Sequence, residues 1–217
     1  MSDDAAARQE VLAGARAMLR EGLVVGMVGN VSRRLGDRIL ITPTRVPYAE
    51  MEADDLAVVD LQGEPTQGGR APSRELPVHL AIYESRADVA AIAHTHSPYA
   101  TAWSFLGREL LPRTEENDYY GVGRILTAAP APAGSEELAA HAVELIGQSS
   151  AILLANHGAL AAARTVADAL DVARVVERQA QIAWLLLAQA DALAGASPDP
   201  PPAVRRVGPE ASASVRE

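Results

Sequence analysis

The stretch AAIAHTHSPYAT, residues 90–101, joins a short apolar segment to two histidines and the start of a helix. Residues 89–93 are all apolar, which is typical of a short buried strand. Residues two apart on a strand project from the same face, so His94 and His96 can reach one point at its end. Ser97 is a suitable N-cap for a helix that continues to Leu106. The stretch therefore predicts a strand that delivers a pair of imidazoles to the end of a sheet.

The rest of the chain alternates between strand-like and helix-like segments. Helical spacing is found in residues 3–21, 75–85, 135–146 and 165 to about 192, and strands are predicted at residues 38–42, 56–61, 124–128 and 151–155. Residues 114–121, TEENDYYG, follow neither pattern. We expect one α/β (α+β) domain over residues 1–195 with one main sheet. Residues 196–217 are rich in proline and are predicted to form a flexible tail.

The composition excludes several classes of protein. The net charge is −9, and aromatic residues make up only 4% of the 217 residues, so neither a basic nucleic-acid surface nor base-stacking platforms are expected. The absence of cysteine excludes disulfides and thiolate metal sites. The acidic start MSDDAAARQE and the lack of an apolar run of about 20 residues predict a cytoplasmic protein without a signal peptide or membrane partner.

A third histidine can join the first two. His157 follows the apolar strand at residues 151–155, and Gly158 after it would let the chain turn closely past a bound ion. Three imidazoles with an open fourth position are typical of a catalytic zinc site. The alternative is that they are ordinary histidines of turns or of the core. His79 lies four residues after Glu75 on one helical face, so it either supports a metal ligand or is simply packed, and we favour a structural role. His141 is expected at the surface.

Candidate partners for a metal or an anion lie in three other segments. Glu75 starts a helix and is either a metal ligand or general base, or an ordinary glutamate of a first helical turn. The turns Gly29-Asn30-Val31-Ser32 and Thr42-Pro43-Thr44-Arg45 offer amides and hydroxyls that can cradle a phosphate. Such residues also populate ordinary surface turns.

Taken together, these segments resemble the class II aldolase/adducin family, most closely its L-fuculose-1-phosphate aldolase type. The resemblance extends from residue 3 to about residue 192 and is carried by GNVSRR, ILITPTRVPY, PSRELPVHLAIY, AAIAHTHSPYAT, ILLANHGAL and VERQAQIAWL. It implies a central, mostly antiparallel sheet flanked by helices. It also implies a homotetramer with fourfold symmetry and active sites between subunits.

The resemblance also implies roles for individual residues. The zinc ligands are His94, His96 and His157, with Glu75 as a further ligand that becomes the base during turnover. The phosphate pocket is formed by Asn30, Thr44 and Ser73, beside Gly29. The implied reaction is the reversible cleavage of a ketose 1-phosphate to dihydroxyacetone phosphate and an aldehyde, with zinc as Lewis acid. Mn²⁺ or Co²⁺ can also occupy such a site.

Two arginines depart from the pattern of this family. Arg45 stands where the family usually has glycine, and Arg74 stands where the phosphate pocket usually has a second serine. Each substitution adds a guanidinium group near the anion site. We expect one of them to contact a phosphate or carboxylate, or the pocket to be reshaped. The alternative is that the side chains point to solvent.

A second departure concerns the group that handles the proton on the aldehyde oxygen. Glu116 falls closest to the tyrosine that aldolases of this type use, and Tyr119 and Tyr120 follow it. A glutamate at this position resembles the pattern of the methylthioribulose-1-phosphate dehydratases. Asn117 falls near the aspartate of the ribulose-5-phosphate 4-epimerases, and this difference disfavours an epimerase. Three functions therefore remain: an aldolase, a dehydratase or 3-oxo-acid phosphate decarboxylase with the same metal site, and a non-catalytic adducin-like scaffold.

Overall fold

The computed structural model describes residues 3–67 and 69–196 and contains one seven-stranded sheet in the order β3-β2-β1-β4-β7-β6-β5. Only β5 and β6 are parallel neighbours. The expected mostly antiparallel sheet is therefore confirmed. The strands are β1 Asn30–Leu35, β2 Arg38–Ile41, β3 Ala57–Asp60, β4 Ala91–Thr95, β5 Leu126–Ala128, β6 Ala151–Leu154 and β7 Gly158–Ala163. The helices are α1 Asp3–Arg20, η1 Ala53–Asp55, α2 Leu76–Ser85, α3 Pro98–Ser104, α4 Glu115–Tyr119, α5 Glu136–Ile146 and α6 Val166–Ala196.

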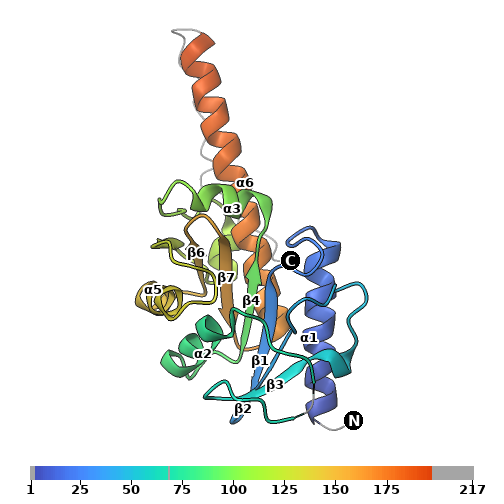
Figure 1. Cartoon of the computed structure of the whole chain (residues 1–217). Coiled ribbons are helices and arrows are strands. Elements are labelled where there is room, and N and C mark those ends of the chain that lie inside the picture. The colour runs from blue at the N-terminus through green and yellow to red at the C-terminus, as the bar shows by residue number, and fades with distance from the viewer. Residues whose placement is uncertain (1–2, 68, 197–217) are drawn as a thin grey trace, which may run out of the picture.

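Helices cover both faces of this sheet, so the molecule has two apolar cores. The first core lies against α1, α3 and α6, and the second lies against α2 and α5, which are seen together on one side of the sheet in Figure 1. Side chains alternate between the two cores along each strand, as the period of two requires. On β4, for example, Ala93 faces the first core and Ile92 the second.

The strand that carries the histidine pair, β4, lies at the centre of the sheet. It pairs with β1 on one side and with β7 on the other, and both neighbours are antiparallel to it. His94 is opposite Asn30 of β1 and opposite Leu160 of β7. Residues far apart in the sequence are therefore brought beside the two histidines by the pairing of the strands.

Two helix starts show the hydrogen bonds that their sequences predict. The Ser135 hydroxyl accepts from the amide of Leu138 at the start of α5. The Thr165 hydroxyl accepts from the amide of Asp168 and donates to its carboxylate at the start of α6. Ser97 occupies the N-cap position of α3 without a capping bond from its side chain, and α3 ends at Ser104 rather than at Leu106.

The last turns of α6 extend beyond the rest of the molecule (Figure 1). Earlier turns of this helix bury Ala173, Val176 and Ala180, whereas Leu187, on the same apolar side, is 41% exposed. The predicted tail begins at residue 196 and, apart from the end of α6, lies outside the described residues. Among the helices described, none combines the length and apolar character that crossing a bilayer requires.

Candidate metal centre

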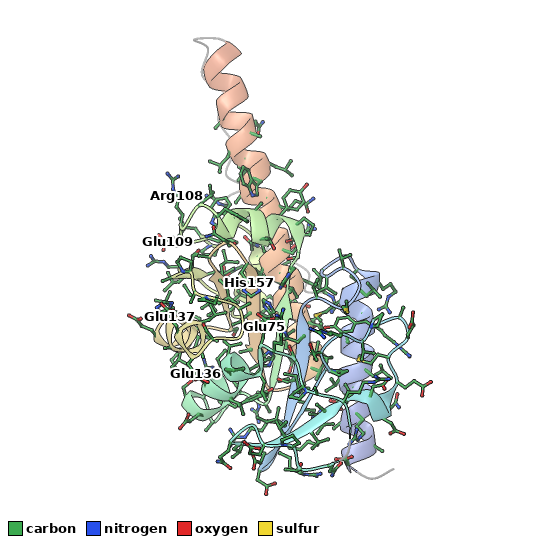
Figure 2. The ribbon with its side chains drawn as sticks, viewed as in Figure 1. Glu75, Arg108, Glu109, Glu136, Glu137 and His157 are labelled. Atoms are coloured by element: carbon green, nitrogen blue, oxygen red, sulfur yellow. The ribbon has the colours of Figure 1, made fainter. Side chains whose placement is uncertain are left out.

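Three imidazoles and one carboxylate converge beside the end of β4. The ligand atoms of Glu75, His94, His96 and His157 all lie within 4.8 Å of one another. The ring centroids of the three histidines are 4.7 or 4.8 Å apart. Figure 2 shows Glu75 and His157 close together near the middle of the molecule. The structure thus brings together all four residues that the sequence suggested as metal ligands.

Different elements position these four side chains. His94 belongs to β4, His96 follows the end of that strand, and Glu75 is the residue before α2. His157 lies in the tight turn that joins β6 to β7. In this turn Asn156 has φ of 58°, a left-handed conformation that asparagine tolerates better than most residues.

Two glycines allow backbone segments to approach the centre closely. A Cβ atom on Gly158 would lie 2.1 Å from the Thr95 carbonyl oxygen, so this glycine is required by the pairing of β7 with β4. The same Cβ atom would lie 3.2 Å from Cδ2 of His96, so this glycine also leaves room for one of the candidate ligand side chains. A Cβ atom on Gly29 would lie 2.6 Å from the His94 carbonyl oxygen, and Gly29 has φ of 73°. Tyr48 fixes the same turn, because its hydroxyl donates to the Gly29 carbonyl at 2.5 Å.

Hydrogen bonds orient the ligand atoms toward a common point. His94 Nδ1 lies 3.0 Å from the Ala159 carbonyl oxygen, to which it can only donate, so the lone pair of Nε2 faces the cluster. That Nε2 is 2.9 Å from His96 Nε2 and 3.2 Å from Glu75 Oε2. Glu75 Oε1 is buried and has no hydrogen bond within the described residues. A divalent ion would satisfy both the orphaned oxygen and the clustered nitrogens, so these residues fit a metal.

The charges in the cluster agree with this fit. Burial opposes ionisation of Glu75, but His94, His157 and Asn30 together lower the pKa of its carboxyl overall. Burial and the neighbouring His94 and His157 lower the pKa of His96 to about 3. Burial likewise lowers the pKa of His157, whereas for His94 the Glu75 carboxylate outweighs burial and the pKa is raised. An ionised carboxylate beside the neutral imidazoles of His96 and His157 is the state in which such groups bind a metal, and at His94 a bound ion would take the place of the proton that Glu75 favours.

A cavity of about 400 Å³ opens beside the cluster, which is a size suited to a small molecule. It contains all six residues that the sequence suggested for substrate binding. Its lining consists of Met27, Val28, Gly29, Asn30, Pro43, Thr44, Arg45, Ser73, Arg74, Glu75, His96, Ala133 and His157. Three apolar residues of this lining, Met27, Val28 and Ala133, belong to no motif, so the sequence did not predict them as part of the site.

The polar groups of this cavity differ in how they are bonded. The Asn30 amide nitrogen donates to Ser73 Oγ at 3.1 Å and to Glu75 Oε2 at 2.8 Å. Arg45 and Arg74 make no hydrogen bond or ion pair within the described chain, and both are exposed. Arg45 also has φ of 60°, which is uncommon for a residue with a side chain. Both guanidinium groups are thus available to an anion in the cavity.

The candidates for proton transfer at the aldehyde oxygen lie elsewhere in the chain. The carboxylate of Glu116 is 3.5 Å from Arg178 of α6, and Tyr120 lines a separate cavity with Arg86 and Asp168. Asn117 is buried and bonds the backbone of Gly123. Within one chain, therefore, neither Glu116 nor Tyr120 reaches the cavity beside the histidines.

Known proteins resemble this chain over most of its length. The family model for the class II aldolase and adducin N-terminal domain matches residues 9–184. A 5-deoxy-D-ribulose 1-phosphate aldolase of Bacillus thuringiensis serovar kurstaki is 37% identical over 177 residues, which cover 81% of this chain and 83% of that protein. An L-fuculose phosphate aldolase of Escherichia coli is 36% identical over 175 residues, or 80% of each chain. A solved structure of an L-fuculose 1-phosphate aldolase superposes with a TM-score of 0.78 at 31% identity, covering 87% of this chain and 89% of that one.

Proposed function

The chain belongs to the class II aldolase and adducin family, and we propose that it is a zinc-dependent aldolase acting on a ketose 1-phosphate. The reaction is reversible cleavage to dihydroxyacetone phosphate and an aldehyde. The observation that carries this proposal is the cluster of Glu75 with three histidines, next to a cavity with two unpaired arginines. Relatives named for 5-deoxyribulose 1-phosphate and L-fuculose phosphate support a deoxy-ketose as the substrate.

The four residues of the cluster are proposed to hold the metal. When bound there, a divalent ion supplies a Lewis acid that polarises the carbonyl group of the substrate. Zinc is the ion that three imidazoles and a carboxylate suit best, and Mn²⁺ or Co²⁺ can replace it. His94 is oriented for this role by the Ala159 carbonyl group.

The phosphate is proposed to bind in the same cavity, at the hydroxyl and guanidinium groups that line it. Ser73 Oγ already accepts from the Asn30 amide and from the backbone amide of Glu75, so its own hydrogen is free to donate to an anion. The Thr44 hydroxyl has no partner within the described residues and lines the same cavity. Arg45 and Arg74 add charge-assisted donors, which are stronger than neutral ones.

Glu75 is proposed to move the proton on carbon. One of its carboxylate oxygens is held by Asn30, and the other has no hydrogen bond within the described chain. In the cleavage direction the bond between C3 and C4 of the ketose breaks, and Glu75 returns a proton to C3, which becomes the hydroxymethyl carbon of dihydroxyacetone phosphate. Phosphate binding fixes the substrate so that C3 stays within reach of this carboxyl group.

A neighbouring subunit is proposed to complete the site. Glu116 and Tyr120 do not line the cavity of their own chain, although one of them is the candidate to take the proton of the C4 hydroxyl in cleavage and to return it to the aldehyde oxygen in synthesis. A homotetramer with active sites between subunits would bring these residues to the cavity of the next chain.

A retro-aldol assay on several ketose 1-phosphates tests the proposal. We expect release of dihydroxyacetone phosphate that a chelator abolishes and that added Zn²⁺ restores. Glu75→Gln should lower kcat by at least about a hundredfold, because it removes a general base. The matched control is Glu136→Gln, an exposed position on α5 far from the cluster (Figure 2). A zinc-loaded protein that releases no dihydroxyacetone phosphate from any substrate would refute the aldolase and favour dehydration or decarboxylation.

A further inference from the structure

A line of buried hydrogen bonds connects α2 to the carboxylate of Glu75. Tyr83 Oη lies 2.7 Å from Ser32 Oγ, and Ser32 Oγ lies 2.7 Å from His79 Nδ1. His79 Nε2 lies 2.5 Å from Asn30 Oδ1, and Asn30 Nδ2 lies 2.8 Å from Glu75 Oε2. The side chains between α2 and the sheet, Asn30, Ser32, His79 and Tyr83, are at most 1% exposed.

The ionised carboxylate of Glu75, at the end of this line, decides the direction of every hydrogen bond in it. An ionised carboxylate accepts and cannot donate, so the Asn30 group that faces Glu75 is the NH₂ group. Asn30 Oδ1 therefore faces His79, and His79 Nε2 must carry a hydrogen. Burial lowers the pKa of His79 to about 3, so the ring is neutral and its Nδ1 accepts from Ser32. Ser32 in turn accepts from the Tyr83 hydroxyl.

We propose that His79 is a positioning residue that fixes the amide of Asn30 and thereby holds Glu75 in the geometry for binding metal. This inference rests on the proposed role of the cluster as a metal site. An Asn30 amide turned by 180° would place its oxygen 2.8 Å from the carboxylate of Glu75, where two acceptors repel each other. The hydrogen on His79 Nε2 prevents this turn, because it would then face the NH₂ group.

The same amide serves both halves of the site. Its second hydrogen is donated to Ser73 Oγ, which lines the cavity, so the orientation fixed by His79 also frees the Ser73 hydroxyl hydrogen for an anion. Replacing a side chain that orients a metal ligand through a hydrogen bond changes metal affinity or activity by about 10–100-fold. His79 orients the ligand Glu75 indirectly, because it fixes Asn30 and Asn30 donates to Glu75.

Zinc affinity, measured by competition with a chelating dye, tests this role independently of catalysis. His79→Leu should weaken zinc binding by about 10–100-fold. His79→Gln places an amide N–H where Nε2–H lies and should return the affinity to within about fivefold of wild type, because the bond to Asn30 is kept. Ile82→Ala is the matched control, since Ile82 is fully buried on α2 and lies in the apolar core. It should lower the melting temperature and leave zinc affinity unchanged.

Two outcomes would overturn the proposal: equal zinc affinities of His79→Leu and Ile82→Ala, or no recovery in His79→Gln. If His79→Leu fails to fold, Ser32→Ala replaces it, because this change removes one hydroxyl and frees His79 to take the other tautomer. An unchanged zinc affinity in Ser32→Ala then refutes the positioning role of His79. If the wild-type protein binds zinc but cleaves no sugar phosphate, only the proposed aldolase activity is refuted. The zinc affinities of the variants still test the positioning role of His79.

Discussion

Replacement of Gly29 by alanine separates two effects that the structure attributes to this position. Gly29 has φ of 73°, and a Cβ atom there would lie 2.6 Å from the His94 carbonyl oxygen. Gly22, after α1, also has φ of 73°, but nothing lies within 4 Å of its Cβ position. Gly22→Ala therefore introduces only the left-handed strain, about 1–2 kcal/mol, whereas Gly29→Ala adds a steric clash of about 1–3 kcal/mol.

The expected difference of about 2 kcal/mol corresponds to a melting temperature about 4–8 °C lower for Gly29→Ala than for Gly22→Ala in a chain of this size. Urea denaturation measures the same difference as a shift in the midpoint. Because the clash displaces the backbone of His94, zinc affinity should fall in Gly29→Ala and stay at the wild-type value in Gly22→Ala. Equal destabilisation of the two variants would refute the argument that Gly29 is needed for contact with β4.

Further predictions concern the metal, the anion pocket and the second subunit. Zn²⁺ at 100 times its dissociation constant should stabilise the fold by about 2.7 kcal/mol and raise the melting temperature by about 5–10 °C. His157→Asn should abolish this rise and His141→Asn should keep it, and a rise that persists in His157→Asn would contradict the ligand set. Arg74→Ala should raise KM for a phosphorylated substrate more than about tenfold, since a guanidinium–phosphate contact is lost; an unchanged KM would remove Arg74 from the pocket. Glu116→Gln should leave zinc binding intact and lower kcat about a hundredfold, and an unchanged kcat would transfer the role to Tyr120, tested by Tyr120→Phe.

The sequence predicted those parts of the site that depend on local geometry. His96 lies two residues after His94, just beyond the last residue of β4, so their convergence agrees with the period of two expected for a strand. Pairing partners have no such local signal. That Asn30 lies opposite His94 depends on the register of β1 against β4, and the register is set by the whole sheet.

Elements with atypical residues were the ones missed. Strand β7 reads GALAAA, and neither glycine nor alanine favours strands, so its pairing with β4 and β6 decides its structure. Helix α4 is formed by only five residues from a polar segment without helical periodicity. A structural role was favoured for His79 because its position in a helix does not predict its contact with the Asn30 amide.

The central position of β4 has a consequence for the order in which the chain acquires structure. Its partners in β1 and β7 are between 58 and 72 residues away in the sequence, and such long-range pairings form slowly. During synthesis, the histidine of the β6–β7 turn leaves the ribosome long after the histidine pair of β4. The full ligand set therefore exists only once the middle of the sheet has closed. A spectroscopic signal of zinc binding should consequently appear at the rate of the slowest refolding phase. That rate would be the rate of the last step in the formation of this sheet.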